Sequence, residues 1–134
     1  MTPSLDWDFL WHSATLACMN EGGAAYGLIE NGAIAVKDEE IAWIGRVSEL
    51  PGPPESLAKE VREEHGRCIT PGLIDSHTHV SLAADGRSYT ELFAQTDELM
   101  VLWGVANLRR HLDAGITTLR DNGARNMVAF ALKE

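Results

Sequence analysis

Residues 68–80 read Cys68-Ile69-Thr70-Pro71-Gly72-Leu73-Ile74-Asp75-Ser76-His77-Thr78-His79-Val80, an apolar segment that ends in two histidines separated by one residue. In an extended strand, residues i and i+2 point to the same face, so His77 and His79 are predicted to project side by side while Thr78 turns away. Neutral imidazole is the commonest metal ligand in proteins, with nitrogens about 2.0–2.1 Å from a zinc ion. The segment therefore predicts a pair of metal ligands at the end of a strand.

The residues around the pair, Thr-Pro-Gly-Leu-Ile-Asp-x-His-x-His, resemble the motif of the amidohydrolase superfamily. In that family the motif marks the end of the first barrel strand and the first two metal ligands. The resemblance implies a distorted (β/α)8 barrel with one or two divalent metal ions, with zinc as the expected metal and iron or manganese as alternatives. The family's other ligands and its catalytic aspartate are expected beyond Glu134, so no catalytic residue is assigned within the chain.

Composition narrows the class of protein. The chain has 134 residues, of which 45% are hydrophobic, so it can bury the core of an ordinary domain. Its formal net charge of −9 repels polyanions and argues against nucleic-acid and anionic-membrane binding. The N-terminus carries acids where a signal peptide needs bases, and no apolar run has membrane-spanning length, so a cytoplasmic protein is expected. Cys18 and Cys68 lack CxxC spacing and are predicted to be reduced and buried.

The first part of the chain is rich in β-forming residues. The segment 8–19 predicts one or two short strands, and two apolar runs, 33–36 and 41–45, predict a hairpin. Because its tip, Asp38-Glu39-Glu40, has no glycine, a longer turn than the tightest primed type is predicted. Three stretches resemble the β-rich N-terminal domain of imidazolonepropionases: Leu10-Trp11-His12-x-Ala14-Thr15-Leu16, Tyr26-Gly27-Leu28-Ile29-Glu30-x-Gly32-Ala33-Ile34-Ala35-Val36 and Ile41-Ala42-Trp43-Ile44-Gly45.

The segment after the histidine pair, residues 81–96, is a glycine-containing loop in the sequence. The family resemblance implies that this loop helps to form the substrate pocket, with Arg87 and Tyr89 as candidate substrate contacts. A guanidinium at Arg87 can bind a substrate carboxylate through two parallel hydrogen bonds. The alternative is an ordinary surface arginine in a polar loop.

Residues 97–114 predict an amphipathic helix that Asp97 caps and Gly115 ends. Its predicted buried stripe consists of Val101, Val105, Leu108 and Leu112, widened by Leu99 and Trp103. His111, near the end of this helix, is interpreted as structural or solvent-facing.

Residues 116–121 predict a second short strand, so that strand, helix and strand form one parallel βαβ unit. Its sequence, Gly-x-Thr-Thr-x-Arg-Asp, resembles the second barrel strand of imidazolonepropionase-related and prolidase-like amidohydrolases. Arg120 and Asp121 would lie near the metal, where they either bind substrate or shape the loop. Residues 124–134 begin another helix.

The predicted fold class is α/β with a β-rich N-terminal part. Residues 1–67 would form a small β-sandwich-like composite domain, and residues 68–134 the first βαβα portion of an incomplete metal-dependent hydrolase barrel. The predicted function is that of an N-terminal fragment of an amidohydrolase that uses metal-activated water on C–N bonds of cyclic amides, amidines such as imidazolonepropionate, or dipeptide-like small molecules. Alone, the chain is expected to be inactive, and to need the rest of the barrel or self-association as a homo-oligomer. The alternative is a non-catalytic module that binds a partner or a structural metal.

Overall fold

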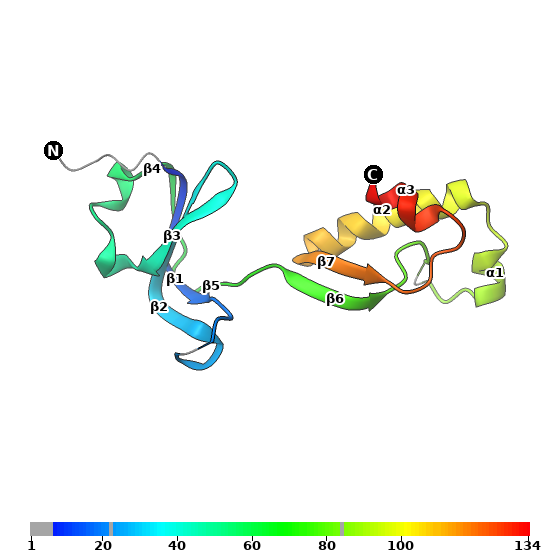
Figure 1. The fold of residues 1–134 in the computed structure, drawn as a ribbon, viewed down its shortest axis with the longest axis horizontal. Coiled ribbons are helices and arrows are strands. Elements are labelled where there is room, and N and C mark those ends of the chain that lie inside the picture. The colour runs from blue at the N-terminus through cyan, green and yellow to red at the C-terminus, as the bar shows by residue number, and fades with distance from the viewer. Residues whose placement is uncertain (1–6, 22, 84) are drawn as a thin grey trace. The chain divides into compact units, whose positions relative to one another are not determined.

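The computed structural model describes residues 7–21, 23–83 and 85–134. The chain divides into two compact units, Met1–Pro71 and Gly72–Glu134 (Figure 1). The division falls a few residues after the expected boundary at residue 67, because the short strand β5 (Cys68–Ile69) pairs with β1 (Trp7–Ala17) in the first unit. The segment 68–80 is therefore two strands that belong to different units.

The first unit is built on one five-stranded sheet in the order β3-β2-β1-β4, with β5 also on β1. β1 and β3 are antiparallel to β2, whereas β4 and β5 run parallel to β1. The remaining elements are β2 (Leu28–Lys37), β3 (Glu40–Arg46), β4 (Ala58–Glu63) and the short 3-10 helices η1 (Ala25–Gly27), η2 (Val47–Glu49) and η3 (Pro54–Ser56). The two runs 33–36 and 41–45 pair with each other, which confirms the predicted hairpin.

The core of this unit lies on one face of the sheet, under the segment that carries η2 and η3. Its residues are Trp7, Leu10, Ala33, Ala35 and Leu57, with Trp43, Val47, Leu50, Ala58 and Val61 packed against them. Because residues 47–57 cover this face, the described residues form a single covered sheet rather than the two packed sheets expected of a sandwich.

The opposite face of the sheet is apolar as well. Its side chains form two rows that follow the register, Phe9-Val36-Ile41 and Trp11-Ile34-Ile44. Phe9 and Trp11 stack with ring centroids 5.6 Å apart, and Ile41 and Ile44 are 64% and 44% exposed. When one face of a sheet meets water, the side chains on that face are mostly polar. The two apolar rows, which we call the open apolar face, therefore have the composition of a buried surface.

The turn between β2 and β3 differs from the prediction. Lys37 pairs with Glu40, so only Asp38 and Glu39 form the loop, and their φ values are +50° and +69°. Positive φ at both central residues is the requirement of the tight type I′ turn, which was predicted to be disfavoured. The prediction was wrong, and one stabilising contact is visible: the carboxylate of Asp8 accepts a hydrogen bond from the Asp38 backbone N–H at 2.9 Å.

The second unit is the predicted βαβ unit followed by a short helix. Its elements are β6 (Leu73–Thr78), α1 (Tyr89–Phe93), α2 (Asp97–Asp113), β7 (Ile116–Asp121) and α3 (Val128–Lys133). β6 and β7 pair in parallel, and α2 packs against β7 and α3 (Figure 1). The predicted helix 97–114 is confirmed, but its cap is Thr96, whose hydroxyl accepts from the Leu99 N–H at 3.3 Å. Gly115, with φ +84°, follows the helix as predicted.

The predicted buried stripe of α2 is wrong in part, because Val105 is 56% and Leu112 58% exposed. The face that packs inward follows the same spacing one position earlier, at Met100, Gly104, Asn107 and His111. One position corresponds to a rotation of about 100° around a helix. Gly104 permits this orientation, since a Cβ there would lie 2.3 Å from a methyl carbon of Leu132 in α3.

Arg125, in the loop after β7, is hydrogen-bonded to the start of α2. The Arg125 Nε donates to the Asp97 carboxylate at 2.9 Å, and its Nη2 donates to the Gln95 carbonyl at 2.6 Å. Hydrogen bonds from Asn126 and Arg125 lower the pKa of Asp97.

In the described part of the chain, no helix combines the length and apolar character needed to cross a membrane. Both cysteines are free as predicted, but neither is buried: Cys18 is half-buried and Cys68 is exposed.

Candidate functional site

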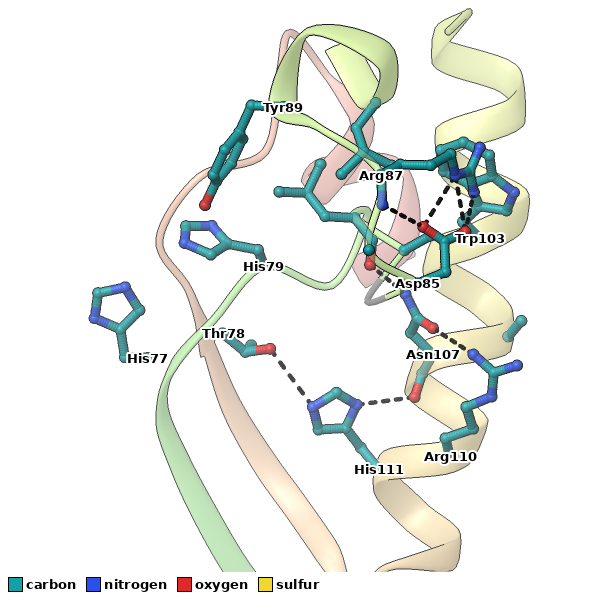
Figure 2. A pocket seen from close by; sticks show the side chains of 15 residues that line it. His77, Thr78, His79, Asp85, Arg87, Tyr89, Trp103, Asn107, Arg110 and His111 are labelled. Atoms are coloured by element: carbon teal, nitrogen blue, oxygen red, sulfur yellow. Dashed lines mark hydrogen bonds and ion pairs between the residues drawn. The ribbon is translucent and has the colours of Figure 1, made fainter.

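The two histidines lie beside each other at the carboxyl end of β6. Their ring centroids are 5.4 Å apart and their planes meet at 76°. Figure 2 shows both rings on the same side of the chain, while Thr78 points toward α2, with its hydroxyl 3.5 Å from the His111 Nε2. The His77 N–H donates to the Asp75 carboxylate at 3.0 Å. Alternation along the strand thus brings two imidazoles together.

The pair has the donor chemistry of part of a metal centre. His77 is exposed, and the buried Nδ1 of His79 has no hydrogen-bond partner among the described residues. Gly123, in the loop after β7, lies against the His79 ring, and a Cβ there would be 2.5 Å from Nδ1. The described residues contain no group of three or more histidine, cysteine or acidic side chains placed to hold a metal. Two imidazoles fit a zinc-like ion, and further ligands would have to complete its coordination.

A pocket of about 930 Å³ opens beside the pair, within the second unit (Figure 2). Its lining residues come from the end of β6, the loop and helix that follow, and α2: His77, Thr78, His79, Leu82, Ala83, Asp85, Gly86, Arg87, Tyr89, Leu92, Trp103, Ala106, Asn107, Arg110 and His111. Seven described residues between Leu82 and Leu92 and the two histidines thus face one cavity, which mixes apolar, aromatic and cationic groups as small-molecule sites do.

Arg87 is held in this pocket by two neighbours. Its Nε donates to both carboxylate oxygens of Asp85, at 3.0 and 2.8 Å, and its guanidinium lies 4.5 Å from the centroid of the Trp103 ring. The hydrogen bonds between the two side chains lower the pKa of Asp85 and raise that of Arg87. The Arg87 Nη2 also pairs with the Asp85 carboxylate at 2.6 Å. The guanidinium keeps the N–H donors of Nη1, so it can still bind a carboxylate.

Tyr89 lines the same pocket from the first turn of α1. Its ring stacks on Phe93 with centroids 6.0 Å apart, and it remains 65% exposed. In Figure 2 its hydroxyl is directed toward the His79 ring. Tyr89 thus presents a polar group to the histidine pair.

The two candidates on β7 are placed differently. Arg120 is exposed, and neither it nor Asp121 lines the pocket. One oxygen of Asp121 accepts from the Gly123 N–H at 3.0 Å, and the other is buried without a partner among the described residues. Asp121 therefore shapes the loop that carries Gly123 to the His79 ring.

Sequence reasoning assigned no residue of α2 to the site, yet five of them line the pocket: Trp103, Ala106, Asn107, Arg110 and His111. Asn107 Nδ2 donates to the carbonyls of Val80 and Leu82, at 2.8 and 2.9 Å. His111 Nδ1 donates to the Asn107 carbonyl at 2.8 Å, and its Nε2 lies 3.8 Å from the Asp75 carboxylate. His111 was interpreted as either structural or solvent-facing, and these contacts support a structural role. The signal in the sequence was the i, i+3, i+7 spacing of Gly104, Asn107 and His111, which marks a second, polar face of the helix.

Solved structures of similar fold indicate the class of protein to which the chain is related. No family model matches the chain. The fold is similar to that of an amidohydrolase crystal structure, with a TM-score of 0.66 and 26% identity over 92% of this chain and 29% of that one. It is also similar to an adenosine deaminase from Xanthomonas campestris with bound zinc, with a TM-score of 0.72 and 16% identity over 97% of this chain and 32% of that one. The chain thus has a mixed α/β fold that resembles the N-terminal portion of amidohydrolase-superfamily hydrolases.

The sequence points to a particular group within that class. The chain is 37% identical over 133 residues to the imidazolonepropionase of Shewanella amazonensis, a match that covers 95% of this chain and 32% of the relative. A second imidazolonepropionase, from Shewanella sp. strain W3-18-1, is 46% identical over 92 residues, or 68% of this chain and 22% of the relative. The chain is a homologue of imidazolonepropionases, which confirms the resemblance, and it spans about a third or less of the length of these relatives.

Proposed function

We propose that the chain supplies the first two metal ligands and part of the substrate pocket of a metal-dependent amidohydrolase. The observation that carries this proposal is the placement of His77 and His79 beside each other at the end of β6, at the edge of a pocket of about 930 Å³. Active sites of (β/α)8 barrels lie at the carboxyl ends of the strands, and β6 and β7 would be the first two strands of such a barrel. The sequence similarity to imidazolonepropionases supports the same assignment.

His77 and His79 would hold a divalent metal, most simply zinc, since imidazole nitrogen is among its preferred ligands. A metal bound there would supply activation of water at neutral pH and polarisation of the scissile carbonyl or amidine carbon. Iron and manganese are the alternatives. Whether one or two ions bind depends on ligands beyond the pair.

The pocket residues would bind and orient a small acidic substrate. Arg87, held by Asp85 and Trp103, would receive a carboxylate, and Tyr89 would place a hydroxyl between that carboxylate site and the histidines. The proposed reaction is hydrolysis of a C–N bond in a cyclic amide or amidine, with imidazolonepropionate as the first candidate and dipeptide-like compounds as the second. Arg120, exposed at the end of β7, is proposed as a further substrate contact and Asp121 as the residue that orders the adjoining loop.

A chimera tests this function. The chain replaces the matching segment of the Shewanella amazonensis imidazolonepropionase, and metal content and hydrolysis of imidazolonepropionate are measured together. We expect the chimera to purify with zinc and to hydrolyse the substrate, because the chain would supply the missing ligands and pocket. A folded chimera that contains no metal would contradict the proposal and favour a non-catalytic module. A metal-containing chimera that is inactive on imidazolonepropionate but active on a dipeptide would move the substrate to the second candidate.

The chain alone is proposed to be inactive and to associate through its uncovered apolar surfaces. These are the open apolar face of the first unit and, in the second unit, Leu73 and Ile74 of β6, which are 55% and 73% exposed. Replacing Ile41 and Ile44 by lysine is expected to weaken self-association by about 10-fold or more, since buried apolar anchors dominate interface energies. Sedimentation velocity over a range of concentrations measures the change. Ser48→Lys, an exposed position in η2, is the control, and a wild-type chain that remains monomeric and active would contradict the proposal.

A further inference from the structure

We infer that Asn107 is a positioning residue that sets the orientation of the His79 imidazole by fixing the turn that follows it. The inference deepens the proposed metal-binding function and rests on it for its significance. Its geometry, however, concerns contacts within the second unit alone, and it can be tested without a metal.

The turn 79–82 is held by three hydrogen bonds. The Leu82 N–H donates to the His79 carbonyl at 3.1 Å, which closes the turn. The Asn107 amide then donates to the carbonyls of Val80 and Leu82 at 2.8 and 2.9 Å. A carboxamide has two N–H hydrogens, and both are used here. Because Val80 is only 3% exposed, water cannot readily replace the hydrogen bond to its carbonyl, whereas Leu82 is half-buried.

His79 needs this support more than His77 does. His77 lies within β6, where its N–H binds Asp75 and the next residue, Thr78, pairs with Asp121 of β7. His79 follows the last residue of β6, so the strand ladder no longer restrains its backbone. Its orientation is therefore set by the turn on one side and by Gly123 on the other.

Asn107 is itself well fixed. It lies in the middle of α2 on the inward face, its Oδ1 accepts from the Arg110 Nη1 at 3.0 Å, and its carbonyl accepts from the His111 Nδ1 at 2.8 Å. The amide orientation follows from the partners, because the two carbonyls require donors and the guanidinium requires an acceptor. The helix thus acts as a rigid support that holds one ligand of the pair through a side chain.

The test is Asn107→Asp, which keeps the size and shape of the side chain but replaces the amide donors by a carboxylate oxygen that repels the carbonyls. In the metal-free chain, NMR relaxation of the ring 13C–1H groups measures the order of each imidazole. We expect the His79 ring to become more mobile, while the rings of His77 and His65 keep their order. Zinc titration of the same variant is expected to show an affinity about 10- to 100-fold lower, the effect typical of lost supporting contacts around a ligand.

Arg109→Ala is the matched control, because it removes an exposed side chain of the same helix that pairs with Asp113 at 3.1 Å and does not line the pocket. This control variant should change neither the order of the His79 ring nor the zinc affinity. Unchanged His79 order in a folded Asn107→Asp chain, or equal loss of order at His77 and His79, would overturn the inference. If Asn107→Asp does not fold, Asn107→Ala, which adds no charge, gives the same comparison. If the wild-type chain binds no zinc by itself, the ring-order comparison still decides the role of Asn107, and the metal content of the chimera decides the proposed function.

Discussion

Replacing His77 and His79 together by alanine is expected to abolish specific zinc binding by the chain. The two rings are the only described histidines whose centroids are brought within 5.4 Å of each other. Loss of contacts that only support a metal ligand lowers metal affinity by up to about 100-fold. Because the double variant removes both ligands themselves, its zinc affinity should fall by more than that. Equilibrium dialysis against buffered zinc at neutral pH, with elemental analysis of the protein, measures the change.

Single variants and a control make this prediction specific. His77→Ala and His79→Ala should each lose most of the affinity, because one imidazole cannot chelate. His65→Ala should keep it, since His65 is an exposed side chain that pairs with Glu63 in the first unit, at 3.0 Å. Equal zinc binding by the double variant and the wild-type chain would show that the pair is not a metal site.

Gly123→Ala is expected to lower zinc affinity by about 10-fold or more without unfolding the chain. A Cβ at this position would lie 2.5 Å from Nδ1 and 2.7 Å from Cε1 of His79, well inside contact distance, so the ring must move. A displacement on the order of 1 Å at a functional group can change its effect by about 10². Isothermal titration calorimetry with zinc measures the affinity, and thermal unfolding followed by circular dichroism measures the stability.

Gly23→Ala is the matched control for this substitution, because no atom lies within 4 Å of a Cβ built there. It should leave zinc affinity unchanged. Full affinity in Gly123→Ala would mean that the His79 ring has room to turn, and that the loop after β7 does not restrict it.

Local patterns were sufficient for the elements that hold the site. The alternation at 77–79, the helical run after Thr96 and the β-branched run before Asp121 each depend on neighbours in sequence, and the structure has a strand, a helix and a strand there. The tight turn at Asp38 and Glu39 was not predicted, because both residues have positive φ and neither is glycine. The Asp38 N–H donates a hydrogen bond to the carboxylate of Asp8, which is distant in sequence.

Residue spacing along a regular backbone was enough to predict the hairpin, the βαβ unit and the adjacency of His77 and His79. The face of α2 that turns inward depends on contacts with other parts of the second unit. An apolar stripe competes there with a face that carries Gly104 and Asn107, and close approach to Leu132 and two hydrogen bonds to the turn after His79 favour the latter. The local spacing shows that both faces exist, but it does not show which one packs inward, because these contacts join residues far apart in sequence.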